Sequence, residues 1–227
     1  MIEAHIWIAL LVIAAIVAQD TTAGPQILFS EPLVTGPVVG WLLGDLRLGL
    51  VIGIAVQLVW SGAVPAGSSL FLDVNVGSLC AVLVATAAGG TFLAMAASLL
   101  WMVPVGLLGT ALTVVNWRLN GKLAASIRPE LDRGRLIGIR HMAGWLLAGL
   151  RGIVTFSVGS VLGLALVPAL VHRLGPHVNQ VLLWAGVCGA GAGVALGVTW
   201  RYGRGKVALL GALCALGLWL LGTRPGW

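Results

Sequence analysis

The chain of 227 residues is 59% hydrophobic and only 9% charged, and its mean hydropathy is +1.04. A soluble domain carries about a quarter charged residues, so this composition excludes a water-soluble globule. It also excludes a disordered chain, which needs low hydrophobicity, and a disulfide scaffold, since the chain has three cysteines. The formal net charge of +6 is typical of basic cytoplasmic loops in a membrane protein, and we expect no nucleic-acid partner.

These properties predict an all-α integral membrane protein, a polytopic helical bundle with about six to eight spans. A spanning helix takes about 20 mostly apolar residues. The first apolar stretch is interpreted as a retained helix, because no Lys or Arg precedes it as in a signal peptide. The predicted helices, in chain order, cover residues 6–18, 32–43, 48–64, 76–88, 91–115, 151–171, 178–199 and 207–221.

We expect residues 1–227 to form a single transmembrane domain in three parts. These parts are N-terminal helices with a sugar site (6–117), a basic segment (118–140) and C-terminal helices (151–222). The basic segment is predicted to be cytoplasmic, because positive charge collects on that side of a membrane. Its apolar residues fall near one helical face, so it could lie along the membrane surface, although Pro129 argues against one continuous helix.

Glycine recurs every four residues in the first third of the chain. The positions are Gly36, Gly40 and Gly44, followed by Gly49 and Gly53. Small residues at this spacing let membrane helices approach closely, and we predict tight helix packing here. The neighbouring pair Asp45 and Arg47 stands at a helix boundary, where a structural role is favoured over a functional one.

Two polar features are candidates for a ligand site. Gln57 lies inside an apolar helix, where it could make an interhelical hydrogen bond or contact a ligand. A broken, re-entrant-like segment near residues 65–75 follows, and transporters use such interruptions to coordinate substrates near the midplane. An extramembrane loop is the alternative interpretation of this segment. Its hydroxyl, carboxylate and amide groups suit a polyhydroxy ligand, and they come from Ser68, Ser69, Asp73 and Asn75.

No catalytic or metal-binding pattern is found. The four histidines stand at segment ends without ligand spacing. The three cysteines lie singly inside apolar runs and are interpreted as small buried side chains. We therefore predict no catalytic residues, no metal site and no cofactor.

The N-terminal third resembles a known family. The run Glu31-Pro32-Leu33-Val34-Thr35-Gly36-x-x-x-Gly40-x-x-Leu43-Gly44-Asp45-x-x-x-Gly49-x-x-x-Gly53 is followed by Gln57-Leu58 and later by Gly67 and Asp73. This pattern is similar to the IIC membrane subunit of the mannose/fructose/sorbose class of the bacterial phosphotransferase system. The likeness is strongest over about residues 27–80, and beyond them it rests on hydropathy and the position of the basic segment.

The resemblance implies a multi-pass sugar-conducting subunit in the bacterial inner membrane. Such a subunit pairs with a IID membrane subunit, and soluble IIA and IIB phosphocarriers phosphorylate the sugar as it enters. The IIC subunit is then no enzyme itself, and we expect it to belong to an oligomer in contact with membrane lipid. The residues that the resemblance and the polar pattern together place at the sugar are Gln57, Gly67, Ser68, Ser69, Asp73 and Asn75.

Three positions depart from the mannose-type pattern. Those proteins usually carry Glu in place of Gln57, Asn in place of Pro65 and a basic residue in place of Glu31. The departures motivate an alternative, a non-transporting assembly or sensory subunit of an incomplete phosphotransferase system. A stand-alone secondary transporter is a third possibility, and its candidate ion-coupling carboxylates are Asp45 and Asp73.

Overall fold

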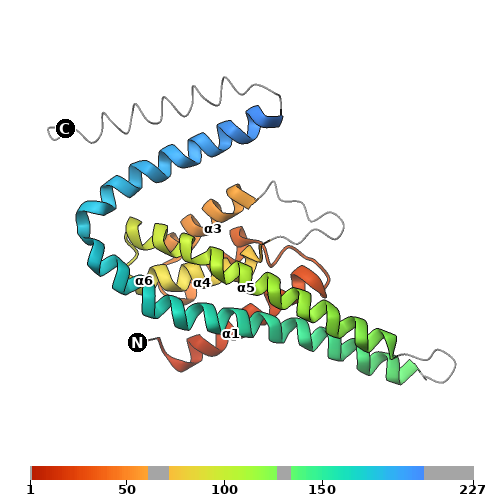
Figure 1. Ribbon diagram of the computed structural model, residues 1–227. Coiled ribbons are helices and arrows are strands. Elements are labelled where there is room, and N and C mark those ends of the chain that lie inside the picture. The colour runs from red at the N-terminus through yellow and green to blue at the C-terminus, as the bar shows by residue number, and fades with distance from the viewer. Residues whose placement is uncertain (1, 61–71, 127–133, 202–227) are drawn as a thin grey trace.

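The computed structural model describes residues 2–60, 72–126 and 134–201, and within these ranges the chain is helical with no strand (Figure 1). The prediction of an all-α membrane bundle is confirmed, because three segments are long and apolar enough to cross a membrane. They are Ala4–Thr22, Phe92–Ala125 and Leu136–Gly175. The helices are α1 (Ala4–Thr22), α2 (Pro32–Leu42), α3 (Leu46–Trp60), α4 (Val74–Ala87), α5 (Phe92–Ala125) and α6 (Gly134–Arg201).

The short helix α4 forms the centre of the bundle. Every residue from Val76 to Ala85 is buried, and α4 packs against all five other helices. A helix that is apolar on every side needs such an environment. Large apolar side chains outside the core, such as Ile8, Leu100 and Val161, are exposed instead, as expected of a surface that faces lipid.

Helices α2 and α3 form an antiparallel hairpin held by glycine on both sides. A Cβ atom added at Gly36 would lie 2.5 Å from the carbonyl oxygen of Gly49 and 2.9 Å from the Cα atom of Gly53. A Cβ added at Gly40 would lie 2.8 Å from the Cα atom of Gly49. The two backbones are therefore in direct contact, which confirms the predicted packing role of Gly36, Gly40, Gly49 and Gly53. Gly44 differs: it lies in the turn with φ 81°, and no atom lies within 4 Å of a Cβ added there.

The turn between α2 and α3 confirms the structural interpretation of Asp45. Its Oδ1 atom accepts a hydrogen bond of 2.9 Å from the backbone N–H of Leu48, in the first turn of α3. An aspartate at a helix start satisfies an N–H group that has no partner within the helix.

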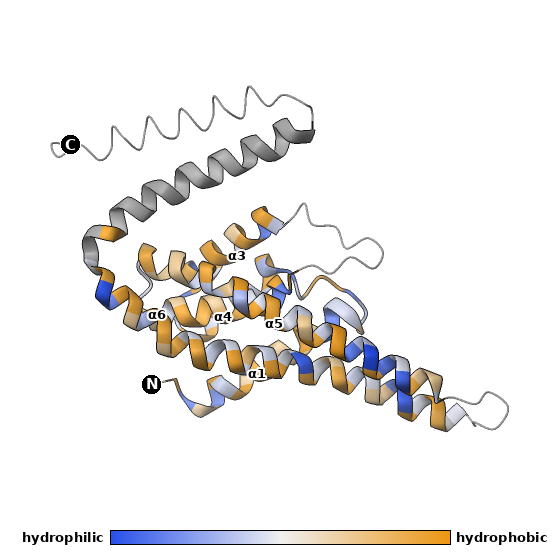
Figure 2. Ribbon diagram, in the orientation of Figure 1, coloured by the Kyte–Doolittle hydropathy of each residue, from blue (hydrophilic) through white to orange (hydrophobic). Residues whose placement is uncertain are grey.

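Helices α5 and α6 form a second, longer hairpin that extends beyond the other helices (Figure 1). Hydrophilic residues collect on this extension, while the body of the bundle is mostly hydrophobic (Figure 2). The structure differs here from the expected surface segment over residues 118–140. Arg118 and Lys122 lie on α5, which continues without a break to Ala125, because both residue types are good helix formers and their charged ends reach water.

The predicted joint at residues 172–177 coincides with a break inside α6. Gly175 has φ 71° and ψ 173°, so the hydrogen-bonded helix cannot continue through it. The chain turns there and the second part of α6 runs to Arg201 (Figure 1). The predicted helix over residues 207–221 lies outside the described residues.

Candidate functional site

Asp73 lies where the backbone enters α4, and its position is fixed from two sides. Its backbone N–H donates to the hydroxyl of Thr110 (3.1 Å) and to the carbonyl of Gly106 (3.2 Å), both on α5. Its Oδ1 atom accepts a hydrogen bond of 3.3 Å from the backbone N–H of Val76 and so caps α4. The start of α4 is therefore tied to α5 through Asp73.

Arg151 on α6 is the counter-charge of Asp73. Its Nη1 atom lies 2.6 Å from the Oδ2 atom of Asp73 and 2.6 Å from the hydroxyl of Thr113. Its Nη2 atom donates to the carbonyl of Ala18 on α1 at 3.1 Å. The side chains of Arg151 and Asp73 are only 4% and 8% exposed. One guanidinium therefore joins four helices by hydrogen bonds: α1, α4, α5 and α6.

This ion pair is what the sequence interpretation missed. Arg151 follows the apolar run Ala143–Leu150, and the hydropathy pattern predicts only that it is the first residue of a span. An arginine inside an apolar helix is costly in lipid and generally pairs with an acid in the bundle interior, which is the signal that could have identified it. The acid could not be chosen from the sequence, because Asp73 is 78 residues away.

Gln57 makes the interhelical hydrogen bond that was one of its two predicted roles. Its Nε2 atom donates to Oε2 of Glu31 at 2.8 Å, and its Oε1 atom accepts from the backbone N–H of Leu33 at 3.3 Å. Glu31 is the residue just before α2, so Gln57 on α3 satisfies the open end of the neighbouring helix. Gln57 is thus hydrogen-bonded to Glu31, and both residues stand at positions where this sequence departs from the mannose-type pattern.

Gln57→Glu is expected to lower the free energy of unfolding by about 1–3 kcal/mol, because the carboxylate of Glu31 would lose its donor and face a like charge. The double variant Glu31→Lys/Gln57→Glu is expected to recover most of this loss by restoring an opposite-charge pair. Unfolding in mixed detergent micelles measures both effects. A single variant as stable as Gln57→Met, which lacks the like charge, would contradict the contact.

The remaining candidate residues are distributed as follows. Asn75 lies in the first turn of α4, half-buried, and its backbone carbonyl accepts a hydrogen bond of 2.8 Å from the hydroxyl of Ser78. Gly67, Ser68 and Ser69 lie outside the described residues. In the part of the chain that is described, Asp73 and Gln57 belong to separate hydrogen-bonded pairs, and no direct bond joins them.

Bonds among the described residues leave hydrogen-bonding capacity on both pairs. A carboxylate has about four acceptor positions, and the bonds above use two of those on Asp73. The amide of Gln57 uses one of its two donors and one of its two acceptor positions. Arg151 balances the charge of Asp73, whereas the Gln57 pair includes the carboxylate of Glu31.

The family model described as the sorbose-specific IIC component of the phosphotransferase system matches residues 5–200. The mannose-specific EIIC components of Escherichia coli strain K12 and of Shigella flexneri are each 24% identical to this chain over 160 residues. That match covers 67% of this chain and 59% of each relative, so the matched part spans a little over half of the length of these relatives.

The fold is also similar to that of a solved transporter. A cryo-electron microscopy structure of the mannose transporter ManYZ with microcin E492 superposes with a TM-score of 0.62 at 16% identity, covering 99% of this chain and 82% of that one. At this identity the likeness concerns the fold alone. The match of the family model over most of the chain establishes more: the protein belongs to the family of sorbose-specific IIC components of the phosphotransferase system.

Proposed function

We propose that the chain is the sugar-conducting IIC subunit of a mannose-class phosphotransferase system in a bacterial inner membrane. The observation that carries this proposal is the family match over residues 5–200. In this role the chain conducts a sugar while soluble IIA and IIB proteins supply and transfer the phosphoryl group. A IID-type membrane subunit completes the complex, and the chain itself performs no phosphoryl transfer.

The proposed sugar site combines the polar groups of α3, of the start of α4 and of the segment between them. Gln57, Asp73 and Asn75 supply amide and carboxylate groups, and Gly67, Ser68 and Ser69 come from the connecting segment. A site with several acceptors and donors, in which Arg151 balances the charge of Asp73, suits a neutral polyhydroxy ligand. The ion pair with Arg151 also argues against ion coupling through Asp73, because it already balances the charge of that carboxylate.

Asn75→Ala is expected to lower sugar uptake about tenfold, the effect of losing one or two hydrogen bonds to a hydroxyl pair, while the amount of protein in the membrane stays constant. Asn75 is the variant of choice because, unlike Asp73, it has no part in the ion pair. Uptake of labelled hexoses by cells that produce the complete complex, and that lack other mannose-class systems, measures the effect.

Asn120→Ala on α5 is the matched control. It removes a side-chain amide of the same kind, near the C-terminal end of α5 and away from the start of α4. Equal uptake by both variants would remove Asn75 from the site. Calorimetry on the purified complex addresses the non-transporting alternative. Saturable heat with a hexose supports the transport function, whereas its absence over the whole hexose panel favours an assembly or sensory subunit.

A further inference from the structure

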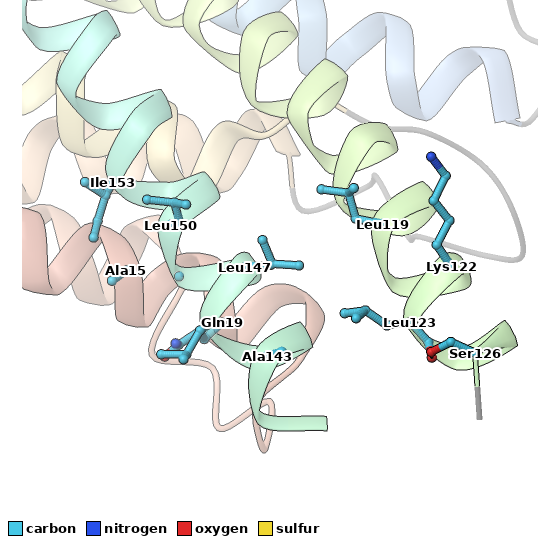
Figure 3. A pocket seen from close by; sticks show the side chains of 12 residues that line it. Ala15, Gln19, Leu119, Lys122, Leu123, Ser126, Ala143, Leu147, Leu150 and Ile153 are labelled. Carbon is cyan, nitrogen blue, oxygen red and sulfur yellow. The ribbon is translucent and has the colours of Figure 1, made fainter. Parts of the chain in front are cut away.

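A groove of about 930 Å³ lies where the α5–α6 hairpin leaves the bundle (Figure 3). Its walls come from three helices and are mostly aliphatic. Leu119 and Leu123 on α5 lie opposite Leu147 and Leu150 on α6, and Ala15 on α1 lies at one end (Figure 3). The groove is thus large enough for a drug-sized or lipid-like ligand.

The groove begins near the level where the hydrocarbon of a membrane ends and extends outward from it. Leu119 follows the first residue of α5, Phe92, by about 40 Å at 1.5 Å per residue, whereas a hydrocarbon core is about 30 Å thick. The aliphatic wall runs from Ile153 toward Ala143, since α6 is antiparallel to α5. It therefore leads from membrane depth toward the headgroup region.

Basic residues border the outer end of the groove. Lys122 and Ser126 line it there, and Arg118 is exposed one helical turn before Lys122. Neither α5 nor α6 contains an Asp or Glu residue. The nearest carboxylate in sequence to the groove residue Gln19, that of Asp20, accepts hydrogen bonds from the backbone N–H groups of Ile27 and Ser30. The segment that joins the two helices, residues 127–133, carries two acidic residues and two arginines, so its formal net charge is zero. Among the described residues, the charged groups at the groove mouth are therefore basic.

We propose that this groove is a binding site for one anionic phospholipid of the cytoplasmic leaflet. An acyl chain lies between the leucines of α5 and α6, and the phosphate lies beside the ammonium of Lys122. The apolar wall provides hydrophobic burial, and the lysine selects a negatively charged headgroup. The proposal uses none of the residues assigned to the sugar site and stands independently of transport.

Native mass spectrometry of the purified full-length protein, in micelles with equal amounts of phosphatidylglycerol and phosphatidylcholine of identical chains, tests the proposal. The wild-type protein is expected to retain one phosphatidylglycerol in about fivefold preference to phosphatidylcholine, the factor that one interfacial lysine contributes. Lys122→Gln should abolish the preference. Ala143→Phe fills the groove and should remove the retained lipid itself, whereas Arg173→Gln, which removes an exposed charge elsewhere on α6, should change nothing.

Two outcomes would overturn the proposal. One is equal retention of the two lipids by the wild-type protein, or an undiminished preference in Lys122→Gln. The other is an Ala143→Phe variant that keeps its lipid but loses a co-purifying membrane subunit, because the groove would then hold a helix of that subunit.

Discussion

Replacing Arg151 by methionine is expected to destabilise the bundle by about 3–5 kcal/mol, the cost of leaving one member of a buried ion pair without its partner. The carboxyl group of Asp73, whose side chain is only 8% exposed, would lose its counter-charge. Thr113 and the carbonyl of Ala18 would each lose a donor, so α1, α4 and α5 would no longer be joined to α6 at this point. Unfolding in mixed detergent micelles, followed by circular dichroism, measures the loss.

The double variant Asp73→Asn/Arg151→Met separates the ion pair from the general packing of Arg151. Asparagine caps a helix about as well as aspartate and carries no charge, so the double variant should cost less than the sum of the two single changes. Arg151→Lys should be intermediate, because a lysine cannot reproduce the fork that binds three partners. Arg173→Met, on the exposed surface, should stay within about 0.5 kcal/mol of the wild type. Strict additivity in the double variant would show that the two charges do not interact.

Gly49→Ala is expected to cost about 3 kcal/mol or more, although it adds a single methyl group. The new Cβ atom would overlap the carbonyl oxygen of Gly36 and would lie 2.8 Å from the Cα atom of Gly40. Both neighbours are backbone atoms, so they can yield only if α2 moves away from α3. The same unfolding measurement and the yield of folded protein report this effect.

Gly121→Ala on α5 is the control, because no atom lies within 4 Å of the added Cβ. Alanine is the better helix former, so this variant should be as stable as the wild type or up to about 1 kcal/mol more stable. If both alanine variants behaved alike, the close approach of α2 and α3 would be refuted.

Gly49 contacts a neighbouring backbone and Gly121 does not, and this difference shows which parts of the fold can be predicted from the sequence. The spacing of Gly36, Gly40, Gly49 and Gly53 is local, and it predicts the contact of two neighbouring helices. Helix positions could likewise be predicted from unbroken apolar runs. The continuation of α5 past Arg118 could not, because hydropathy marks the end of the membrane and not the end of the helix.

The candidate site was harder to predict because it depends on long-range pairing. The hydrogen-bonding groups of Gln57 and Asp73 were recognised, but their partners Glu31 and Arg151 were not, since the first pair is 26 residues apart and the second 78. Residue types indicate that a buried polar group must be satisfied, and only the packing of the helices determines by which group. The sugar-contacting roles therefore stay a proposal.

The separation of Asp73 and Arg151 along the chain also sets the order in which the protein can be completed. At synthesis rates of about 5–20 residues per second, Arg151 is made about 4–16 s after Asp73. During this interval α4 and α5 are synthesised, yet the carboxylate at the start of α4 lacks the counter-charge that Arg151 supplies. The first part of α6 supplies it, together with a donor for α1. Among the described helices, α6 is thus the one that completes this polar contact, and α1 and α4 meet their charge partner only once its first part has been made.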